Sequence, residues 1–243
     1  MTLKQIADVN FPTRWANFRL LAFEALHANR KTRRESLETA LVLVLGDIHQ
    51  SPPLVRIHSQ CVTGEAFHSL RCDCHDQLQL ALRRIAEEGA GILLYEQQEG
   101  RGIGLMEKLR AYELQDNGFD TVEANLQLGH VVDARDYALV VEILRMLKVR
   151  SLRLISNNPE KIKAVKASGI QIVERIAADV LGNPHSTRYL ATKRDKLGHL
   201  VNLSSAPPRR TNPRSHGAPF SQSSIEAAGP DAEICADLRG GQW

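Results

Sequence analysis

Residues 56–75 read R-I-H-S-Q-C-V-T-G-E-A-F-H-S-L-R-C-D-C-H and bring together Cys61, Cys72 and Cys74. Three thiolates can hold a tetrahedral zinc ion while its fourth position stays open for water, which distinguishes a catalytic zinc site from a structural one. The stretch begins inside residues 54–58, a short apolar run that is typical of a strand. We therefore expect a strand that leads directly into a metal site with hydrolytic chemistry.

Two other interpretations of these cysteines stay open. A free cysteine is often a small buried hydrophobic residue, and the spacing of Cys72 and Cys74 alone does not exclude this. The many polar neighbours favour a metal, because polar groups are costly in a core but are needed around metal ligands. A disulfide is the weaker alternative, since the opening M-T-L-K-Q-I-A-D-V-N lacks the pattern of a secretory signal. Thiols in the cytosol stay reduced, and we expect a cytoplasmic protein.

Length and charge restrict the class of protein. A chain of 243 residues allows one or two domains, and a hydrophobic content of 43% is ordinary for a globular protein. The longest clearly apolar run, residues 40–45, is far too short to cross a bilayer. The net charge of +3 is mild and suits a small anionic substrate. We expect neither a membrane nor a nucleic acid as a partner.

Residues 204–243 differ from the rest of the chain. They are rich in proline, serine and glycine and lack sustained periodicity, so they cannot bury enough apolar surface to become ordered. We expect one catalytic domain over residues 1–203 and a disordered tail over residues 204–243. Cys235 lies in this tail and is expected to be an idle thiol.

The body of the chain alternates strand and helix patterns. The helix expected at residues 76–88 has Leu78, Leu82 and Ile85 on one face and Gly89 after its end. This order predicts an α/β (mixed α+β) domain in which helices flank a sheet that carries the zinc site. The other expected elements are strands at residues 40–45, 54–58, 91–95 and 152–156 and helices at residues 105–115 and 135–147.

The glycine-rich segment E-G-R-G-I-G, residues 99–104, lies between an expected strand and an expected helix. Glycines allow a close approach of the backbone to a ligand, and a helix start offers free amides to an anion. The same composition is more often only a turn, and the pattern is neither a Walker loop nor a dinucleotide fingerprint. Both interpretations stay open.

Two further segments suggest helix starts. Asn158 is suited to the N-cap of a helix that begins at the following proline. Ser156 and Lys161 would then flank a helix end that favours a phosphate, although capping alone explains the pattern. Asp133 is suited either to cap the helix expected at residues 135–147 or to form a surface ion pair.

Several blocks of the chain resemble, in order and spacing, the GTP cyclohydrolase II family of riboflavin synthesis. The resemblance covers roughly residues 10–202, and it implies that Cys61, Cys72 and Cys74 bind one zinc per chain. It further implies that zinc activates water to open the imidazole ring of GTP. Formate and pyrophosphate would leave, and 2,5-diamino-6-hydroxy-4-(5-phosphoribosylamino)pyrimidine would remain. Mg²⁺ on the triphosphate and a homodimer are also implied. The blocks are R-I-H-S-Q-C, S-L-R-C-D-C, G-I-L-L-Y, Q-E-G-R-G-I-G-L, A-Y-E-L-Q-D-N-G-F-D-T-V-E-A-N, D-A-R-D-Y and N-N-P-E-K-I.

The resemblance implies further roles residue by residue. Asp133 matches the general base, and Arg135 matches the nucleophile that displaces pyrophosphate from the α-phosphate. A guanidinium stays protonated in nearly all proteins, so binding of phosphate by charge is the alternative role for Arg135. Tyr112 matches a tyrosine that assists at the ring. The positions that match contacts to GTP are Arg56, Ile57, His58, Ser59, Gln60, Gln77, Glu99, Gly100, Arg101, Thr121, Ser156 and Lys161.

Three residues depart from the family pattern. His75 stands where glycine is usual, His130 where an aromatic residue is common, and Ser156 where threonine is frequent. An imidazole directly after Cys74 raises the alternative of a closed metal site with four protein ligands and no water. Adjacent residues seldom both reach one metal with relaxed geometry, so we expect His75 not to be a ligand.

Two alternatives to hydrolysis of GTP stay open. A related enzyme would keep the fold and yield another product or serve another pathway, which product analysis would separate. A structural zinc module would have no catalysis, and the arginines of its tail would bind nucleic acid or a partner protein. The paired C-x-x-C motifs of a zinc ribbon are absent from the sequence, and the tail carries acidic residues as well.

Overall fold

Residues 1–28, 35–181 and 183–200 are described by the structure, a computed structural model. The tail expected at residues 204–243 and Cys235 lie outside the described residues. Within the described ranges, every helix falls short of the length or the apolarity that a bilayer-spanning helix needs.

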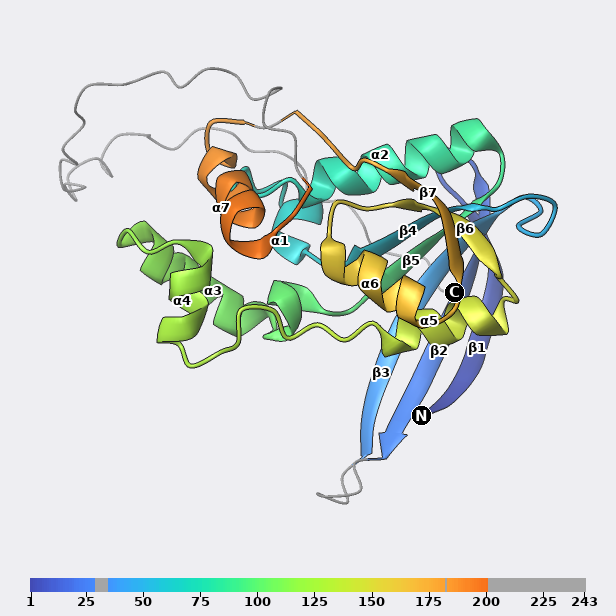
Figure 1. Ribbon diagram of the computed structural model, residues 1–243, viewed down its shortest axis with the longest axis horizontal. Helices are drawn as coiled ribbons and strands as arrows, with labels where there is room; N and C mark the ends of the chain where they lie inside the picture. The colour runs from blue at the N-terminus through green and yellow to red at the C-terminus, as the bar shows by residue number, and fades with distance from the viewer. Residues whose placement is uncertain (29–34, 182, 201–243) are drawn as a thin grey trace, which may run out of the picture. The chain divides into compact units, whose positions relative to one another are not determined.

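A seven-stranded sheet in the order β1-β2-β3-β5-β4-β6-β7 forms the centre of the described part (Figure 1). The first half of this order pairs antiparallel, from β1 to β5, and the second half pairs parallel, from β5 to β7. The strands are β1 (Thr2–Pro12), β2 (Asn17–Ala28), β3 (Glu35–Leu45), β4 (Leu54–Ser59), β5 (Gly91–Glu96), β6 (Ser151–Ile155) and β7 (Gln171–Ile176).

Helices cover both faces of the sheet (Figure 1). Ala81 and Ile85 of α2 pack on one face together with Phe18 and Leu93. The helices α5 and α6 pack on the other face, where Ile143 belongs to the larger hydrophobic cluster. The helices are α1 (Val62–Glu65), α2 (Cys74–Glu88), the 3₁₀ turn η1 (Glu99–Gly102), α3 (Leu105–Asp116), α4 (Thr121–Gln127), α5 (Ala138–Met146), α6 (Pro159–Ala167) and α7 (Thr187–Leu197).

The burial of the strands follows their position in the sheet. β2 alternates, with Leu21, Phe23 and Ala25 buried between more exposed neighbours, as in an antiparallel strand with one face in the core. β4 and β5 are buried along nearly their whole length, as central strands covered on both faces are. Each fully buried Ile or Leu side chain contributes about 1.5–3 kcal/mol to stability through removal of apolar surface from water.

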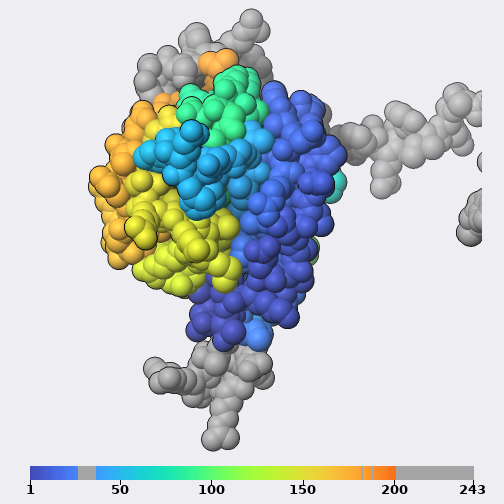
Figure 2. Space-filling model, turned by 90° about the vertical axis from the view of Figure 1, so that its right-hand side faces the viewer, coloured from blue at the N-terminus to red at the C-terminus, as the bar shows by residue number. Residues whose placement is uncertain are grey.

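The parallel arrangement places the carboxyl ends of β4, β5 and β6 at one edge of the sheet. Ligands of such sheets bind outside this edge, because the connecting loops there surround a crevice. The helices α1, α3, α4 and α7 lie beyond this edge (Figure 1). Figure 2 faces the opposite end, where the light-blue loop between β3 and β4 lies between the blue N-terminal strands and the yellow and orange segments.

The predicted mixed domain with helices around a sheet is confirmed, and so are the expected central strands and the α2 helix. The helix expected at residues 135–147 was wrong at its start, since α5 begins at Ala138. Asp133 is therefore not its cap. Oδ1 of Asp133 accepts a hydrogen bond from the backbone N–H of Arg135 at 3.1 Å and closes a local turn instead, and Asp136 accepts from the backbone N–H of Ala138.

Candidate functional site

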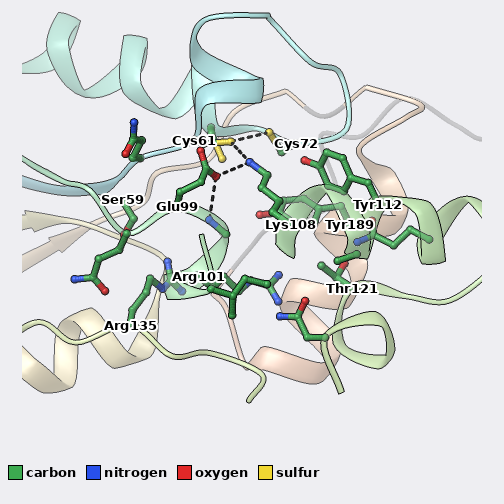
Figure 3. Close-up of a pocket in the computed structure, with 18 residues that line it drawn as sticks. Ser59, Cys61, Cys72, Glu99, Arg101, Lys108, Tyr112, Thr121, Arg135 and Tyr189 are labelled. Carbon is green, nitrogen blue, oxygen red and sulfur yellow. Dashed lines mark hydrogen bonds and ion pairs between the residues drawn. The ribbon is translucent and has the colours of Figure 1, made fainter. Parts of the chain in front are cut away.

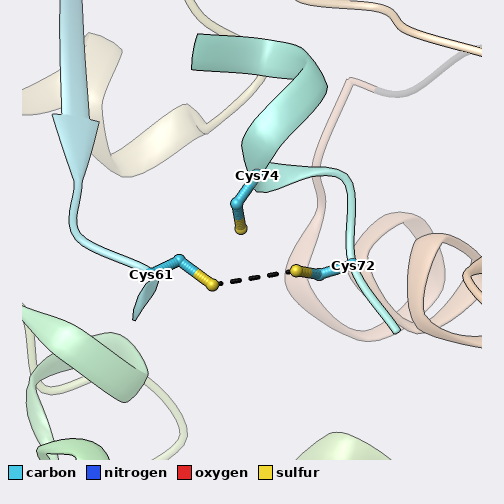
Figure 4. A group of neighbouring side chains, drawn as sticks. All are labelled: Cys61, Cys72 and Cys74. Carbon is cyan, nitrogen blue, oxygen red and sulfur yellow. Dashed lines mark hydrogen bonds between the residues drawn. The ribbon is translucent and has the colours of Figure 1, made fainter. Parts of the chain in front are cut away.

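Three cysteines converge at the carboxyl edge of the sheet (Figure 4). Cys61 follows β4, Cys72 lies in the loop before α2, and Cys74 is the first residue of α2. All three are free thiols, and their sulfur atoms lie within 4.8 Å of one another. Sγ of Cys61 and Sγ of Cys72 are 3.7 Å apart, close to the about 3.8 Å that a tetrahedral zinc with Zn–S bonds of about 2.3 Å requires. The cluster therefore fits a zinc ion.

The backbone of α1 is shaped to this cluster. A Cβ atom at Gly64 would lie 2.8 Å from Sγ of Cys72 and 3.2 Å from Sγ of Cys61. Any side chain at this position would displace a sulfur atom, so the close approach requires glycine. The metal-binding group found among the described residues consists of the three cysteines and does not include His75. The ring of His75 instead meets that of His68 at a centroid distance of 4.3 Å.

Lys108 and Glu99 connect the cluster to the turn after β5. Nζ of Lys108 donates to Sγ of Cys61 at 3.1 Å and to Oε1 of Glu99 at 2.7 Å. Oε2 of Glu99 accepts from the backbone N–H of Val62 at 2.7 Å, next to the first cysteine. The carboxylate of Glu99 thus fixes η1 against the metal-binding loop, and the ammonium group places a positive charge beside a thiolate (Figure 3).

The thiols of the cluster differ in their readiness to ionise. Hydrogen bonds from Cys72 and Cys74, assisted by the charge of Lys108, hold the pKa of the Cys61 thiol far below its ordinary value. The hydrogen bond to Cys61 raises the pKa of Cys72 to about 11. Hydrogen bonds with Cys61 and Cys72 raise the pKa of Cys74 well above its ordinary value. The cluster by itself holds one thiolate readily, and a bound cation would stabilise the other two.

A cavity opens beside the cysteines (Figure 3). Tyr112 of α3 lines it, and its hydroxyl lies 3.4 Å from Oγ1 of Thr63, which in turn lies 3.7 Å from Sγ of Cys61. The cluster therefore faces a cavity, unlike a structural zinc site enclosed by protein ligands.

A second, cationic compartment adjoins the first and shares with it Ser59, Cys74, Arg101, Arg135 and Tyr189. Arg101 has a left-handed backbone with φ 62°, which costs a non-glycine residue stability and clusters at functional sites. Both of its terminal nitrogens are buried without a hydrogen-bond partner among the described residues. Such unpaired guanidinium nitrogens suit an anionic ligand.

Buried Lys161 and Arg56 complete this compartment. Nζ of Lys161 donates to the carbonyl of Ile57 at 2.9 Å and to Oγ of Ser59 at 3.1 Å. Burial, together with the charges of Arg135 and Arg56, holds the pKa of Lys161 well below its ordinary value. Burial also lowers the pKa of Arg56 to about 10. Crowded cations of this kind are relieved by a polyanion.

Arg135 lies at the junction of the two compartments with a surface groove, and Asp133 lines that groove. Nε of Arg135 donates to Oδ1 of Asp133 at 2.8 Å, and a second guanidinium nitrogen donates to Oδ2. Burial by itself lowers the pKa of Arg135, but the hydrogen bond and charge of Asp133 outweigh it and raise the pKa above its ordinary value. A backbone hydrogen bond from Ala134 to Arg101 holds this segment against η1 at 3.0 Å.

The structure brings nearly all the residues expected from the sequence to these compartments. Ile57 differs, because its side chain is 1% exposed and lies in the hydrophobic core, so that only its carbonyl faces Lys161. Asp133 lines the adjoining groove instead. Those lining the metal side are Ser59, Gln60, Cys61, Cys72, Cys74, Glu99, Gly100, Arg101, Tyr112, Thr121 and Arg135. Those lining the cationic side include Arg56, His58, Gln77, Ser156 and Lys161.

Sequence reasoning missed several residues of the site. Lys108 lies one helical turn before Tyr112, so the helix period placed it on the same face. Glu96 is the last residue of β5, and burial raises its pKa to about 7. Tyr189 and Lys193 belong to α7, and His199 follows this helix. No helix or strand was expected in this part of the chain. No local pattern links that segment to the cysteines.

The chain is similar to known proteins over most of its length. A family model described as GTP cyclohydrolase II matches residues 4–177. A protein named GTP cyclohydrolase-2 from Klebsiella pneumoniae subsp. pneumoniae is 50% identical over 203 residues, which cover 83% of this chain and 98% of the relative. Proteins of the same name from Shigella boydii serotype 18 and Escherichia coli K12 are each 49% identical over 203 residues, 83% of this chain and 100% of the relative. The chain belongs to the GTP cyclohydrolase II family.

Proposed function

We propose that the chain hydrolyses GTP in a zinc-dependent reaction that opens the imidazole ring of guanine. The products are formate, pyrophosphate and 2,5-diamino-6-hydroxy-4-(5-phosphoribosylamino)pyrimidine, and the reaction is the first step of riboflavin biosynthesis. The observation that supports this most directly is a three-cysteine cluster that faces a cavity joined to a cationic compartment. The two ends of a nucleoside triphosphate match these two parts. The base has an electrophilic ring carbon for the cysteine side, and the polyanionic phosphate chain suits the cationic compartment.

Cys61, Cys72 and Cys74 would hold the zinc in this proposal. Zinc supplies Lewis-acid chemistry and a coordinated water of lowered pKa, with one position left by three protein ligands. Lys108 offsets the negative charge of the thiolates at Cys61. The hydroxyl of Tyr112 is linked through Thr63 to the cluster, and in this proposal it would donate a hydrogen bond toward the guanine ring.

The triphosphate would lie in the cationic compartment. Arg101 offers two unpaired guanidinium nitrogens, and Arg56 and Lys161 add buried positive charge. Arg135 is held by Asp133 at the border of the two compartments, where the α-phosphate of a nucleotide would pass. In this proposal Asp133 orients the guanidinium and serves as the base, while Arg135 acts at the phosphate either as the nucleophile or by its charge.

Mg²⁺ is proposed to accompany the triphosphate, because a hard cation bound by phosphate oxygens and few carboxylates is usual for such substrates. A homodimer, a cytoplasmic location and the absence of membrane and nucleic-acid partners also remain predictions. Sedimentation of the purified chain tests the dimer.

One experiment tests the proposed function. The purified chain is incubated with GTP and Mg²⁺, and formate, pyrophosphate and the pyrimidine are assayed together. Equal amounts of all three are expected. Pyrophosphate without formate would indicate a related enzyme with another product. No turnover of GTP by zinc-loaded protein would favour a structural zinc module.

A further inference from the structure

The C-terminal helix α7 lies outside the segment that the family model matches, yet it is built into the site. Nζ of Lys193 donates to Oδ1 of Asp73 at 2.8 Å, and the side chains of both residues are at least nine-tenths buried. Asp73 stands between the metal-binding cysteines Cys72 and Cys74. A helix far along the chain is thus connected by a buried ion pair to the loop that presents two of the three sulfur atoms.

Asp73 also connects the loop to Gln77 and, through it, to Arg56. Its Oδ2 accepts from Nε2 of Gln77 at 2.6 Å, and Oε1 of Gln77 accepts from the guanidinium of Arg56 at 2.7 Å. The chain of contacts therefore runs from Lys193 through the metal-binding loop to the cationic compartment. Burial by itself lowers the pKa of Lys193, but the charge of Asp73 outweighs it and raises the pKa above its ordinary value.

Tyr189 is one helical turn before Lys193 on α7 and lines both compartments. Its ring lies near two cations, with the guanidinium carbon of Arg101 5.9 Å and the ammonium nitrogen of Lys193 4.5 Å from its centroid. Tyr189 and Tyr112 are both labelled in Figure 3 among the residues that line the cavity. An aromatic ring beside cations can contact a planar base or a ribose and hold Arg101 in place.

Two further anchors hold α7 in this position. Nζ of Lys196 donates to Oε1 of Glu123 at 3.0 Å and also contacts Asp120, the residue that caps α4. Beyond the helix, the backbone N–H of Leu200 donates to the carbonyl of Asn157 at 2.9 Å, in the loop that follows β6. The α7 segment is therefore fixed to the loop of Cys72 and Cys74, to α4 and to the loop that follows β6.

We propose that α7 completes the metal and nucleotide site, with Lys193 as a positioning residue for the loop of Cys72 and Cys74 and Tyr189 as a wall that contacts the bound nucleotide. The identities of the metal and the nucleotide rest on the proposed function. Loss of Lys193 leaves the Asp73 carboxylate buried with fewer partners, which loosens the loop and weakens the metal site. Loss of the Tyr189 ring affects the nucleotide and not the metal.

The test compares zinc affinity, measured by competition with a chromophoric chelator, between the parent chain and variants of α7. Lys193→Met is expected to weaken zinc binding about 10- to 100-fold, and Lys193→Arg, which keeps the charge, is expected to restore most of it. Arg194→Met is the matched control, since Arg194 pairs with its neighbour Asp195 on the exposed face of the same helix. Parent-like zinc affinity of Lys193→Met would overturn the positioning role.

Asp73→Asn and the double variant Asp73→Asn/Lys193→Met show whether the two residues act as a unit. If they do, the double variant loses no more zinc affinity than the weaker-binding single variant, whereas independent effects would multiply. A loss of zinc affinity in the double variant equal to the product of the two single losses would contradict the proposed connection.

Tyr189→Leu keeps the proposal testable if the charge variants fail to fold. This variant is expected to raise the KM for GTP about tenfold with zinc affinity unchanged, as loss of an aromatic contact worth roughly a factor of ten predicts. An unchanged KM would overturn the nucleotide wall. Failure of the proposed function is distinguishable, because it would show as absence of formate release in the parent chain, while zinc affinity is measured without turnover.

Discussion

Nζ of Lys108 lies 3.1 Å from Sγ of Cys61, so a partly buried ammonium group accompanies the sulfur with the lowered pKa in the cluster. Burial by itself lowers the pKa of Lys108, but the negative charge at Cys61 outweighs it and raises the pKa above its ordinary value. The ammonium charge of Lys108 thus favours the thiolate of Cys61, and the thiolate favours the protonated form of Lys108.

Lys108→Met is expected to weaken zinc binding at neutral pH about tenfold. Without the ammonium group the pKa of the Cys61 thiol rises, and zinc must displace a proton that the parent chain has already released. The affinity measured between about pH 6 and pH 9 should consequently fall more steeply toward acid in the variant. Lys163→Met is the control, because Lys163 is exposed on α6. Identical pH profiles would contradict the pairing.

The central strands and the cluster of three cysteines followed from local patterns in the sequence. A continuous apolar run identifies β4 and β5, and three cysteines within a short stretch predict a group that could hold a metal ion. The N-terminal strands β1 and β2 were not expected, because β1 is largely exposed and carries no strong apolar run.

The contribution of α7 could not be predicted from local patterns. Lys193 meets Asp73 across 120 positions of sequence, and either residue alone is an ordinary charged residue. The side chain of Asp133 bonds to Arg135 and not to a helix start, which its capping pattern did not predict. The pair of Lys193 and Asp73 is decided by topology and packing, because the two residues are far apart in the sequence.

Arg135→Ala is expected to suppress release of both formate and pyrophosphate if the phosphate chemistry comes first. Cys61→Ser is expected to abolish formate release and to leave pyrophosphate release measurable, since it disturbs only the metal side. Quenched-flow assays of both products measure this order. Normal formate release by Arg135→Ala would remove Arg135 from an essential role.

Arg135→Lys separates the two possible roles of this residue. The ion pair with Asp133 keeps the guanidinium charged, which favours binding of phosphate by charge. A lysine would retain that charge without the two-pronged geometry, so partial turnover is expected. Complete loss of turnover, equal to that of Arg135→Ala, would favour the covalent role.

Glu96→Gln is expected to change how the stability of the folded chain depends on pH. Burial raises the pKa of Glu96 from 4.5 to about 7, so between these values the unfolded chain has released a proton that the folded chain keeps. The free energy of unfolding of the parent therefore falls as pH rises through this window, by about 3 kcal/mol from this group. Urea unfolding of both proteins at about pH 5 and pH 8 should show a smaller fall in the variant, and parallel curves would contradict the raised pKa.

Truncation after Asn202 is expected to leave zinc content, thermal midpoint and turnover nearly unchanged. The composition of residues 204–243 does not support a core, and the cut lies beyond the backbone contact of Leu200 with Asn157. Differential scanning calorimetry and a zinc assay compare the two chains. A lowered midpoint would show that the tail contributes to the folded domain.

His75→Gly, which introduces the residue usual in the family, is expected to retain zinc and measurable formate release. The ring of His75 meets that of His68 at a centroid distance of 4.3 Å, and His75 is not part of the cysteine group. Removing it therefore takes no ligand from the metal, and the cost is limited to a glycine in the first turn of α2, about 1 kcal/mol or less. Metal analysis after dialysis measures the outcome.

Gly64→Ala provides the contrast for this last variant, because it changes fewer atoms but places a Cβ 2.8 Å from Sγ of Cys72. It is expected to lose most of its zinc, since a sulfur atom or the backbone of α1 must move by several tenths of an ångström and zinc tolerates little distortion of its tetrahedron. Zinc that is lost from His75→Gly and kept by Gly64→Ala would reverse both expectations. That result would identify His75 as a fourth ligand and the site as closed to water, which is incompatible with hydrolysis at the metal.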